Sequence, residues 1–374
     1  MNSLKRIVAI TGILMTIFAL VSRGAESTLP CWQTPAIVDD PILFVKSASD
    51  LTAKATLLRV PKADPVIKNS SGNITYELMH DYTWTAGSRF IYLTPDSRIP
   101  HTTDSELHPK IGSASSAPVA IAADNKSWLL FAREPGHLFH DLQCAASYLA
   151  DDDWTPPKVP SAADSQLRHL RTKLHAKLPI VIVVLGDSIS TGLNATSTAN
   201  LPPYQLGYIG LVAEKLHNRF SSQVSVVNLS VSGKSSPWAL KQLDTVIASK
   251  PDLFICAFGM NDASEKRPAD IFSSNINEVV NKVTTAYPTC DTIIVSPMTA
   301  NPEWKHAAPK LYPEYATNLE KLANDNIAVA NVTRIWELLI KRKSVLDFTG
   351  NGLNHPNDFG HRIYADVILE TVGY

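Results

Sequence analysis

From residue 179 onward the sequence alternates short apolar runs with longer amphipathic stretches, and this alternation limits the folds open to the chain. The apolar runs are rich in β-branched residues, which favours buried strands. Strands that alternate with helices form a parallel sheet covered by helices on both faces. We therefore predict a three-layer α/β/α domain over 178–374 with a parallel five-stranded sheet. The predicted strands are 180–185, 224–229, 253–258, 292–296 and 327–332, and the predicted helices are 208–220, 238–248, 271–286, 312–325 and 359–371.

The region before this alternation has a different texture. Residues 25–150 contain short β-like runs separated by turn residues, and they do not show the spacing of long amphipathic helices. This pattern favours a small antiparallel β-sandwich, jelly-roll-like, as an accessory domain. A charged, proline-bearing linker and a first polar helix, together residues 151–177, are predicted to connect it to the α/β domain.

The first residues predict export. Lys5 and Arg6 precede an apolar stretch from Ile7 to Val21, and small residues follow up to Gly24. This order is typical of a secretory signal peptide, predicted as residues 1–24, and it indicates a secreted or periplasmic protein. An uncleaved anchor is the alternative, although the apolar stretch is shorter than the ~20 residues of a spanning helix. After removal of the signal we expect no membrane contact.

Composition argues against several kinds of partner. The formal net charge is −1 and no dense run of lysine and arginine occurs, so nucleic acid is not an expected partner. The four cysteines form no CxxC pair, and their spacing does not suggest a zinc site. We expect no metal and no cofactor, and the sequence leaves the oligomeric state open.

One segment combines a buried strand with a reactive side chain. Residues 181–185 are apolar, and they lead directly into Gly186-Asp187-Ser188. A turn after a central strand presents its side chains at the sheet edge where open α/β folds bind ligands. A serine hydroxyl there can act as a nucleophile once a base takes its proton, and a neutral histidine suits that task. His355, just before the last predicted helix, is the candidate base.

Two further blocks follow predicted strands in the same order along the chain. Gly233 ends the block after the second strand, and Asn261 lies in the block after the third. With Ser188 and His355, these residues occupy the four signature positions of the SGNH (GDSL) hydrolase superfamily, which residues 178–374 resemble. The resemblance implies a carboxylic ester hydrolase whose oxyanion hole consists of the Ser188 and Gly233 N–H groups and the Asn261 side-chain amide. Such donors stabilise the charge that develops on the carbonyl oxygen.

The sequence departs from the family pattern at one position. Most members carry an aspartate three residues before the histidine, where it orients the imidazole, and here that position is Gly352. Asp347 and Asp358 are the candidate orienting acids, and a backbone carbonyl that leaves a Ser-His dyad is the alternative. Because loss of an orienting acid can cost orders of magnitude in rate, we expect another group to take its place.

The substrate is expected to have a short acyl group on a polar carrier. The loop 191–204 after the nucleophile is polar, and Trp304 is placed where it could line the site. A β-module ahead of an SGNH domain resembles secreted two-domain carbohydrate acetyl esterases, which implies acylated carbohydrate as the substrate. A lipase or lysophospholipase-type esterase is one alternative. A non-catalytic glycan-binding protein on a hydrolase scaffold is the other.

Overall fold

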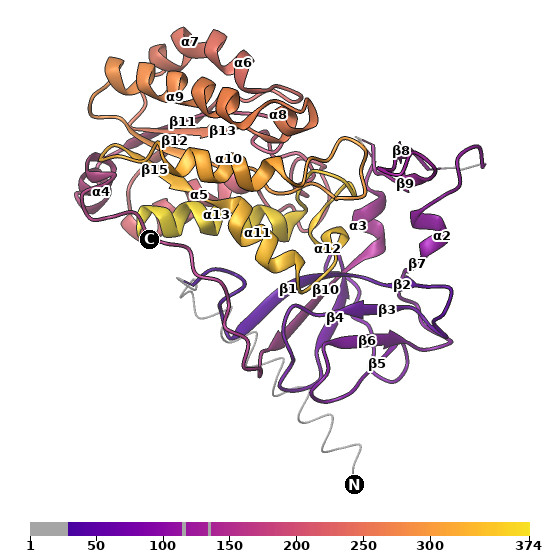
Figure 1. Cartoon of the computed structure of the whole chain (residues 1–374). Coiled ribbons are helices and arrows are strands. Elements are labelled where there is room, and N and C mark those ends of the chain that lie inside the picture. Colours follow the sequence, from indigo (N-terminus) through magenta and orange to yellow (C-terminus); the bar gives the residue numbers. More distant parts are fainter. Residues whose placement is uncertain (1–28, 114–116, 134–135) are drawn as a thin grey trace. The chain divides into compact units, whose positions relative to one another are not determined.

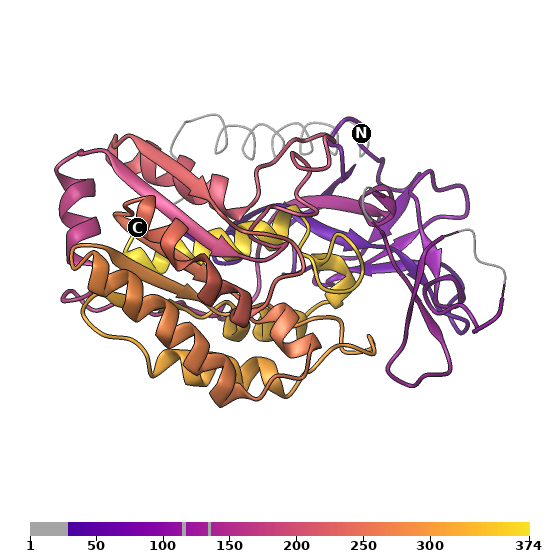
Figure 2. The same cartoon turned by 90° about the horizontal axis from the view of Figure 1, so that it is seen from above.

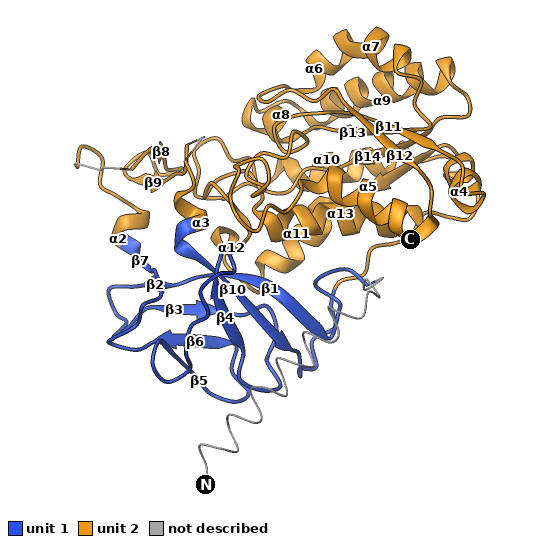
Figure 3. Ribbon diagram, turned by 180° about the vertical axis from the view of Figure 1, so that it is seen from behind, with its two compact units in different colours: residues 1–104, 141–156 blue, residues 105–140, 157–374 orange. Residues whose placement is uncertain are grey.

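The computed structural model describes residues 29–113, 117–133 and 136–374 (Figure 1). The predicted signal peptide, residues 1–24, lies outside them. The chain divides into two compact units, which Figure 3 colours separately. The first unit contains residues up to 104 together with 141–156, and the second contains 105–140 and 157–374. No helix in the described ranges is long and apolar enough to cross a membrane.

The first unit contains two β-sheets that share one apolar core. Residues of both sheets, among them Ile37, Ile67 and Ile91, are fully buried in this core. One sheet has the order β1 (Ala36–Leu43), β10 (Gln143–Leu149), β4 (Val66–Asn69) and is antiparallel. The other has the order β5 (Tyr82–Trp84), β6 (Phe90–Leu93), β3 (Lys54–Thr56), β2 (Val45–Lys46), β7 (Thr102–Thr103), with one parallel pair, β2 and β7. Side chains along β6 alternate between exposed and buried, as a strand with one face on a core requires. The predicted β-rich, largely antiparallel region is confirmed.

The second unit is built on the predicted parallel sheet. Its strand order is β12 (Val224–Asn228), β11 (Ile180–Gly186), β13 (Leu253–Ala257), β14 (Asp291–Val295), β15 (Ile327–Ala330). Strands β13 and β14 are buried at every position, which explains why they are apolar without alternation. The edge strand β12 is more exposed. The order reverses beside β11, because the chain goes from β11 to one neighbour and then crosses to the other. This is the switch point at which such sheets bind ligands.

Helices cover both faces of this sheet (Figures 1 and 2). Helices α5 (Tyr208–Phe220) and α13 (Asp358–Val372) pack together, and α9 (Ala269–Ala286) contacts α6 (Ser236–Ala239), α7 (Leu243–Ala248) and α10 (Leu311–Glu320). Helix α11 (Val332–Ile340) packs on α10 and α13. The predicted helix 238–248 is divided into α6, a 3₁₀ turn (Leu240–Gln242) and α7. The first helix after the linker, α4, spans Arg168–His175.

Residues 105–140 belong to the second unit, whereas the sequence analysis placed them in the β-sandwich. They begin within α2 (Asp104–Leu107), form the hairpin of β8 (Val119–Ile121) and β9 (Trp128–Leu130), and end within α3 (Leu138–Leu142). The hairpin buries Ala122 and Leu129 against Leu353, and the partly buried Trp304 packs on the same cluster. Lys305 N–H donates to the Ile121 carbonyl at 3.1 Å. We name residues 105–140 the hairpin insertion.

Candidate active site

Ser188 lies in the turn that follows the central strand β11. Gly186 ends this strand, and a Cβ there would lie only 2.7 Å from the Ala257 carbonyl oxygen of β13, so a larger residue does not fit. The turn is held by its own groups: Ile189 N–H donates to Asp187 Oδ1 at 3.0 Å, and Thr191 N–H donates to the Asp187 carbonyl at 3.1 Å. We call residues 186–194 the serine turn. It fixes Ser188 at the carboxyl edge of the sheet.

His355 comes from a loop between α12 (Val345–Phe348) and α13, and its ring reaches Ser188. Ser188 Oγ lies 2.9 Å from His355 Nε2, which is hydrogen-bond distance. The loop doubles back on itself, because Gly350 N–H donates to the His355 carbonyl at 3.0 Å. We call residues 349–357 the histidine loop. Two residues that are 167 positions apart in sequence are thus joined as a hydroxyl and a possible base.

The other ring nitrogen of His355 faces two asparagine side chains. Nδ1 lies 3.0 Å from Asn194 Oδ1, at the end of the serine turn, and 3.1 Å from Asn351 Nδ2, within the histidine loop. Burial, and secondly the nearby charge of His361, lowers the pKa of His355 to about 4. The ring is therefore neutral at ordinary pH. The sequence analysis named neither asparagine, and no spacing or motif distinguishes them from other loop asparagines.

Both predicted orienting acids are bonded elsewhere. Asp358 accepts hydrogen bonds from Thr196 N–H at 2.9 Å and from Thr196 Oγ1 at 2.7 Å. Asp347 lies on α12 with Oδ2 4.0 Å from Lys343 Nζ. Neither carboxylate is among the partners of the His355 imidazole in the described residues. Helix α13 is capped by Asn357, whose side chain accepts from Gly360 N–H at 3.1 Å.

The two further predicted residues lie on neighbouring segments of the same sheet edge. Val231 N–H donates to the Gly186 carbonyl at 3.1 Å, which brings the loop with Gly233 beside the serine turn. Gly233 has φ +76°, a conformation that glycine adopts without strain. Asn261 lies on α8 (Met260–Ser264), and its Nδ2 donates to the Lys234 carbonyl at 2.9 Å. The same nitrogen makes a longer contact of 3.4 Å to Asp187 Oδ2.

Buried ionisable groups surround the serine turn. Burial raises the pKa of Asp187 to about 7, although its hydrogen bond from Ile189 N–H opposes that shift. A cavity of about 10 Å³, bounded by Asp187, Ser190 and Tyr364 among others, lies against this turn and is large enough for one water molecule. Asp262 is structural, because it accepts hydrogen bonds from Ser236 N–H and Oγ and pairs with Arg267.

His361 lies inside α13 and is fully buried. Its Nε2 lies 3.1 Å from the Leu193 carbonyl oxygen, and its Nδ1 accepts from Tyr208 N–H at 3.3 Å. Burial lowers its pKa to about 4, so this ring is neutral as well. His361 thereby ties the serine turn to α5 and α13.

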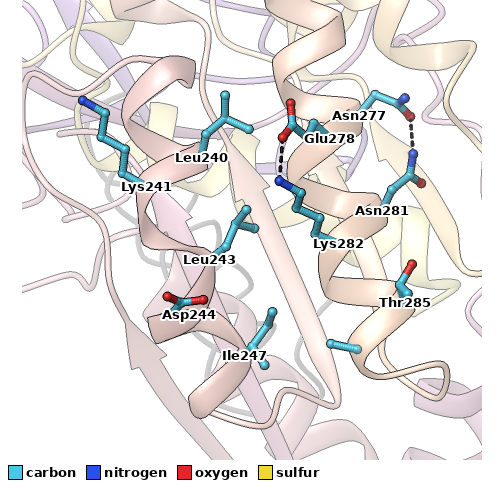
Figure 4. A pocket seen from close by; sticks show the side chains of 11 residues that line it. Leu240, Lys241, Leu243, Asp244, Ile247, Asn277, Glu278, Asn281, Lys282 and Thr285 are labelled. Atoms are coloured by element: carbon cyan, nitrogen blue, oxygen red, sulfur yellow. Dashed lines mark hydrogen bonds and ion pairs between the residues drawn. The ribbon is translucent and has the colours of Figure 1, made fainter.

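A separate groove of about 880 Å³ lies between α7 and α9 (Figure 4). Four of its polar side chains bond in pairs: Asn281 Nδ2 donates to Asn277 Oδ1 at 3.0 Å, and Lys282 pairs with Glu278 at 2.6 Å. None of the residues that line it belongs to the serine turn or the histidine loop. The groove is therefore distinct from the candidate active site.

Comparison with known proteins finds a family match within the second unit. The family model of the GDSL-like lipase/acylhydrolase family matches residues 184–363. No curated protein matches the chain. Among solved structures, Axe2, an acetylxylan esterase from Geobacillus stearothermophilus, is 20% identical over 52% of this chain and 94% of its own, with a TM-score of 0.43. A two-domain esterase (CEX) active on acetylated mannans is 22% identical over 56% of this chain and 52% of its own, with a TM-score of 0.42. The lipase Lip_vut3 from a goat rumen metagenome is 15% identical over 50% of this chain and 95% of its own, with a TM-score of 0.42.

Proposed function

Because residues 184–363 form a GDSL-like lipase/acylhydrolase domain, and the chain is thus a carboxylic ester hydrolase, we propose that Ser188 and His355 carry the reaction. The observation on which this rests is the distance of 2.9 Å between Ser188 Oγ and His355 Nε2. As Oγ attacks the ester carbonyl carbon, Nε2 takes its proton. The same proton then passes to the leaving alcohol as the carbon–oxygen bond breaks. Water, activated by the same ring, hydrolyses the acyl-enzyme and frees Ser188.

The oxyanion hole in this proposal combines two backbone donors with one side chain. The N–H groups of Ser188 and Gly233 supply two hydrogen bonds to the developing oxyanion, and Asn261 Nδ2 supplies the third. One amide hydrogen of Asn261 is held by the Lys234 carbonyl at 2.9 Å. The other makes only the 3.4 Å contact to Asp187, so it is the hydrogen available to substrate.

We infer that the acyl group is short, and acetyl in the first instance, and that its carrier is carbohydrate. The loop 191–204 beside Ser188 is polar, and its backbone is tied down by Asp358 through Thr196. The enzyme would act outside the cytoplasm, secreted or periplasmic, as its first residues indicate.

An acyl-length series tests this function. The purified chain and the Ser188→Ala variant are compared on p-nitrophenyl acetate, butyrate and octanoate, and on acetylated polysaccharides with release of acetate as the readout. We expect the acetate ester to be preferred, acetylated polysaccharide to be deacetylated, and the variant to lose both activities. Preference for octanoate would instead make the protein a lipase-type esterase. Equal hydrolysis by wild type and variant would remove Ser188 from the mechanism.

A further inference from the structure

The histidine loop lacks room for a side chain at the position three residues before His355. Gly352 has φ +80°, and a Cβ there would lie 2.5 Å from two ring carbons of Phe139 and 3.1 Å from the Leu130 carbonyl oxygen. Both partners belong to the hairpin insertion. The insertion also holds the loop next to this position, because Ala132 N–H donates to the Asn351 carbonyl at 3.1 Å. The space beside Gly352 is thus filled by an aromatic ring, and a carboxylate cannot reach His355 from there.

Asn351 cannot take over the orienting role, because its amide is turned the wrong way. Its Oδ1 accepts the N–H groups of Leu353, Asn354 and His355, at 2.9, 3.0 and 3.1 Å. These bonds fix the oxygen on the backbone and leave Nδ2, a donor, facing the His355 ring. A donor next to Nδ1 favours the tautomer in which Nδ1 is bare and Nε2 carries the proton. In that tautomer Nε2 has no lone pair with which to take the Ser188 proton.

Asn194 presents the opposite chemistry to the same nitrogen. Its Oδ1, 3.0 Å from Nδ1, is an acceptor, so it favours the tautomer with the proton on Nδ1 and a free lone pair on Nε2. Asn194 has φ +63°, in the left-handed region that asparagine tolerates better than most residues. Its approach also depends on Gly350, since a Cβ on that residue would lie 2.6 Å from Asn194 Cβ. The two loops are therefore shaped to let this amide meet the ring.

We propose that Asn194 is the positioning residue of this hydrolase: its side-chain oxygen replaces the missing carboxylate and holds His355 in the tautomer that can accept the Ser188 proton. This inference rests on the proposed function. A neutral amide differs from a carboxylate in one measurable way, because it orients the ring without attracting a proton to it. His361 is the ionisable group whose charge acts on His355, and it too is neutral at ordinary pH. Within the described part of the chain, no charged group beside the ring therefore raises its affinity for a proton.

Three variants test the proposal. Asn194→Gly removes the amide and keeps a residue suited to positive φ, and Asn194→Asp restores an acid at the same place. Asn200→Gly is the matched control, because Asn200 lies in the same stretch of chain with φ +54° and is exposed. Each is assayed for kcat and KM on p-nitrophenyl acetate from pH 4 to 9, and the protonated ring nitrogen of His355 is identified by ¹⁵N NMR of histidine-labelled protein.

We expect Asn194→Gly to lower kcat about 100-fold with little change in KM, less than the ~10⁴-fold loss known when a triad acid leaves the wrong tautomer. Its His355 should carry the proton on Nε2. Asn194→Asp should recover most of kcat and move the acid limb of kcat/KM upward by roughly one to three pH units, since an opposite charge favours the imidazolium. Asn200→Gly should match wild type in every measurement.

Two results would overturn the proposal. One is an Asn194→Gly variant that matches Asn200→Gly in kcat and in the tautomer of His355. The other is an Asn194→Asp variant whose acid limb stays at the wild-type pH. Both presuppose an active wild type that depends on Ser188, and an inactive wild type would refute the proposed function instead. The tautomer of His355 in the unliganded protein can be measured by NMR whether or not the wild type is active.

Discussion

The serine turn and the histidine loop supply the two reacting groups, but they are held in different ways. Around Asp187 and Ser188 most bonds are formed within the turn, by Ile189, Thr191 and Leu193. Distant segments hold the turn mainly at its ends, where Val231 N–H donates to the Gly186 carbonyl and His361 Nε2 lies 3.1 Å from the Leu193 carbonyl oxygen. The histidine loop has local bonds around Asn351, yet it is also fixed by distant segments: Asn301 Nδ2 donates to the Gly352 carbonyl at 3.0 Å, and Phe139 packs beside Gly352. The bonds next to the nucleophile are therefore mostly local, whereas the orientation of its base depends on tertiary contacts.

The largest expected loss of kcat comes from removing the reacting group of either region. Ser188→Ala and His355→Ala should each lower kcat by roughly 10⁴–10⁶-fold, and the double variant should be no worse than either, because the two groups act as one unit. Activity on p-nitrophenyl acetate measures this cycle. Ser190→Ala is a suitable control: its hydroxyl bonds to Tyr208 at 2.8 Å, so its loss should affect stability more than kcat. Additive losses in the double variant would show that Ser188 and His355 do not cooperate.

A smaller effect on kcat is expected from Asn261, the side-chain donor of the proposed oxyanion hole. Asn261→Ala should lower kcat by roughly 10²–10³-fold with a lesser change in KM, since the oxyanion forms only in the transition state. The variant also leaves the Lys234 carbonyl without this donor, which should cost about 1 kcal/mol of stability. Steady-state kinetics and thermal unfolding separate the two effects. Asn277→Ala, in the groove between α7 and α9, is the control. An unchanged kcat in Asn261→Ala would remove that amide from the oxyanion hole.

The contact between the two regions can be disturbed without touching either reacting group. Gly350→Ala places a methyl group 2.6 Å from Asn194 Cβ, so one of the two loops has to shift. We expect kcat to fall about 10–100-fold, because a displacement of about 1 Å near a reacting group can cost that much. Thermal unfolding should change less, since the backbone of Gly350 does not require positive φ. A variant with wild-type kcat would mean that the approach of Asn194 to the loop is not needed.

The smallest effect concerns pH. The pKa of His355 is lowered to about 4, so the base stays unprotonated well below the ordinary histidine value of ~6.5. We therefore expect the acid limb of kcat/KM near pH 4–5 rather than near 6.5. The unfolded chain binds protons at His355 and His361 with ordinary affinity, so stability should also decrease as the pH falls from about 6.5 towards 4. An acid limb at 6.5 in a folded enzyme would contradict this environment for His355.

Much of the architecture could be predicted from local patterns. The five strands and the parallel sheet follow from apolar runs such as 181–185, because a strand buried on both faces needs apolar side chains throughout. The same logic placed Ser188 at the sheet edge, where the structure has it. The hairpin insertion, which the sequence analysis placed in the β-sandwich, belongs to the second unit. Its strands resemble those of the β-sandwich in sequence, and tertiary contacts such as the burial of Leu129 against Leu353 show where it packs.

The sequence by itself determined the sheet, the serine turn and the four residues proposed to carry the reaction, because each is encoded in a short stretch of chain. It also showed that Gly352 offers no acid. What stands beside His355 instead was decided by the tertiary structure alone. Asn194 and His355 are 161 residues apart, and which of two asparagines orients the ring depends on where each amide points its oxygen. Such a direction is set by packing and by competing hydrogen bonds, which no local pattern of residues records.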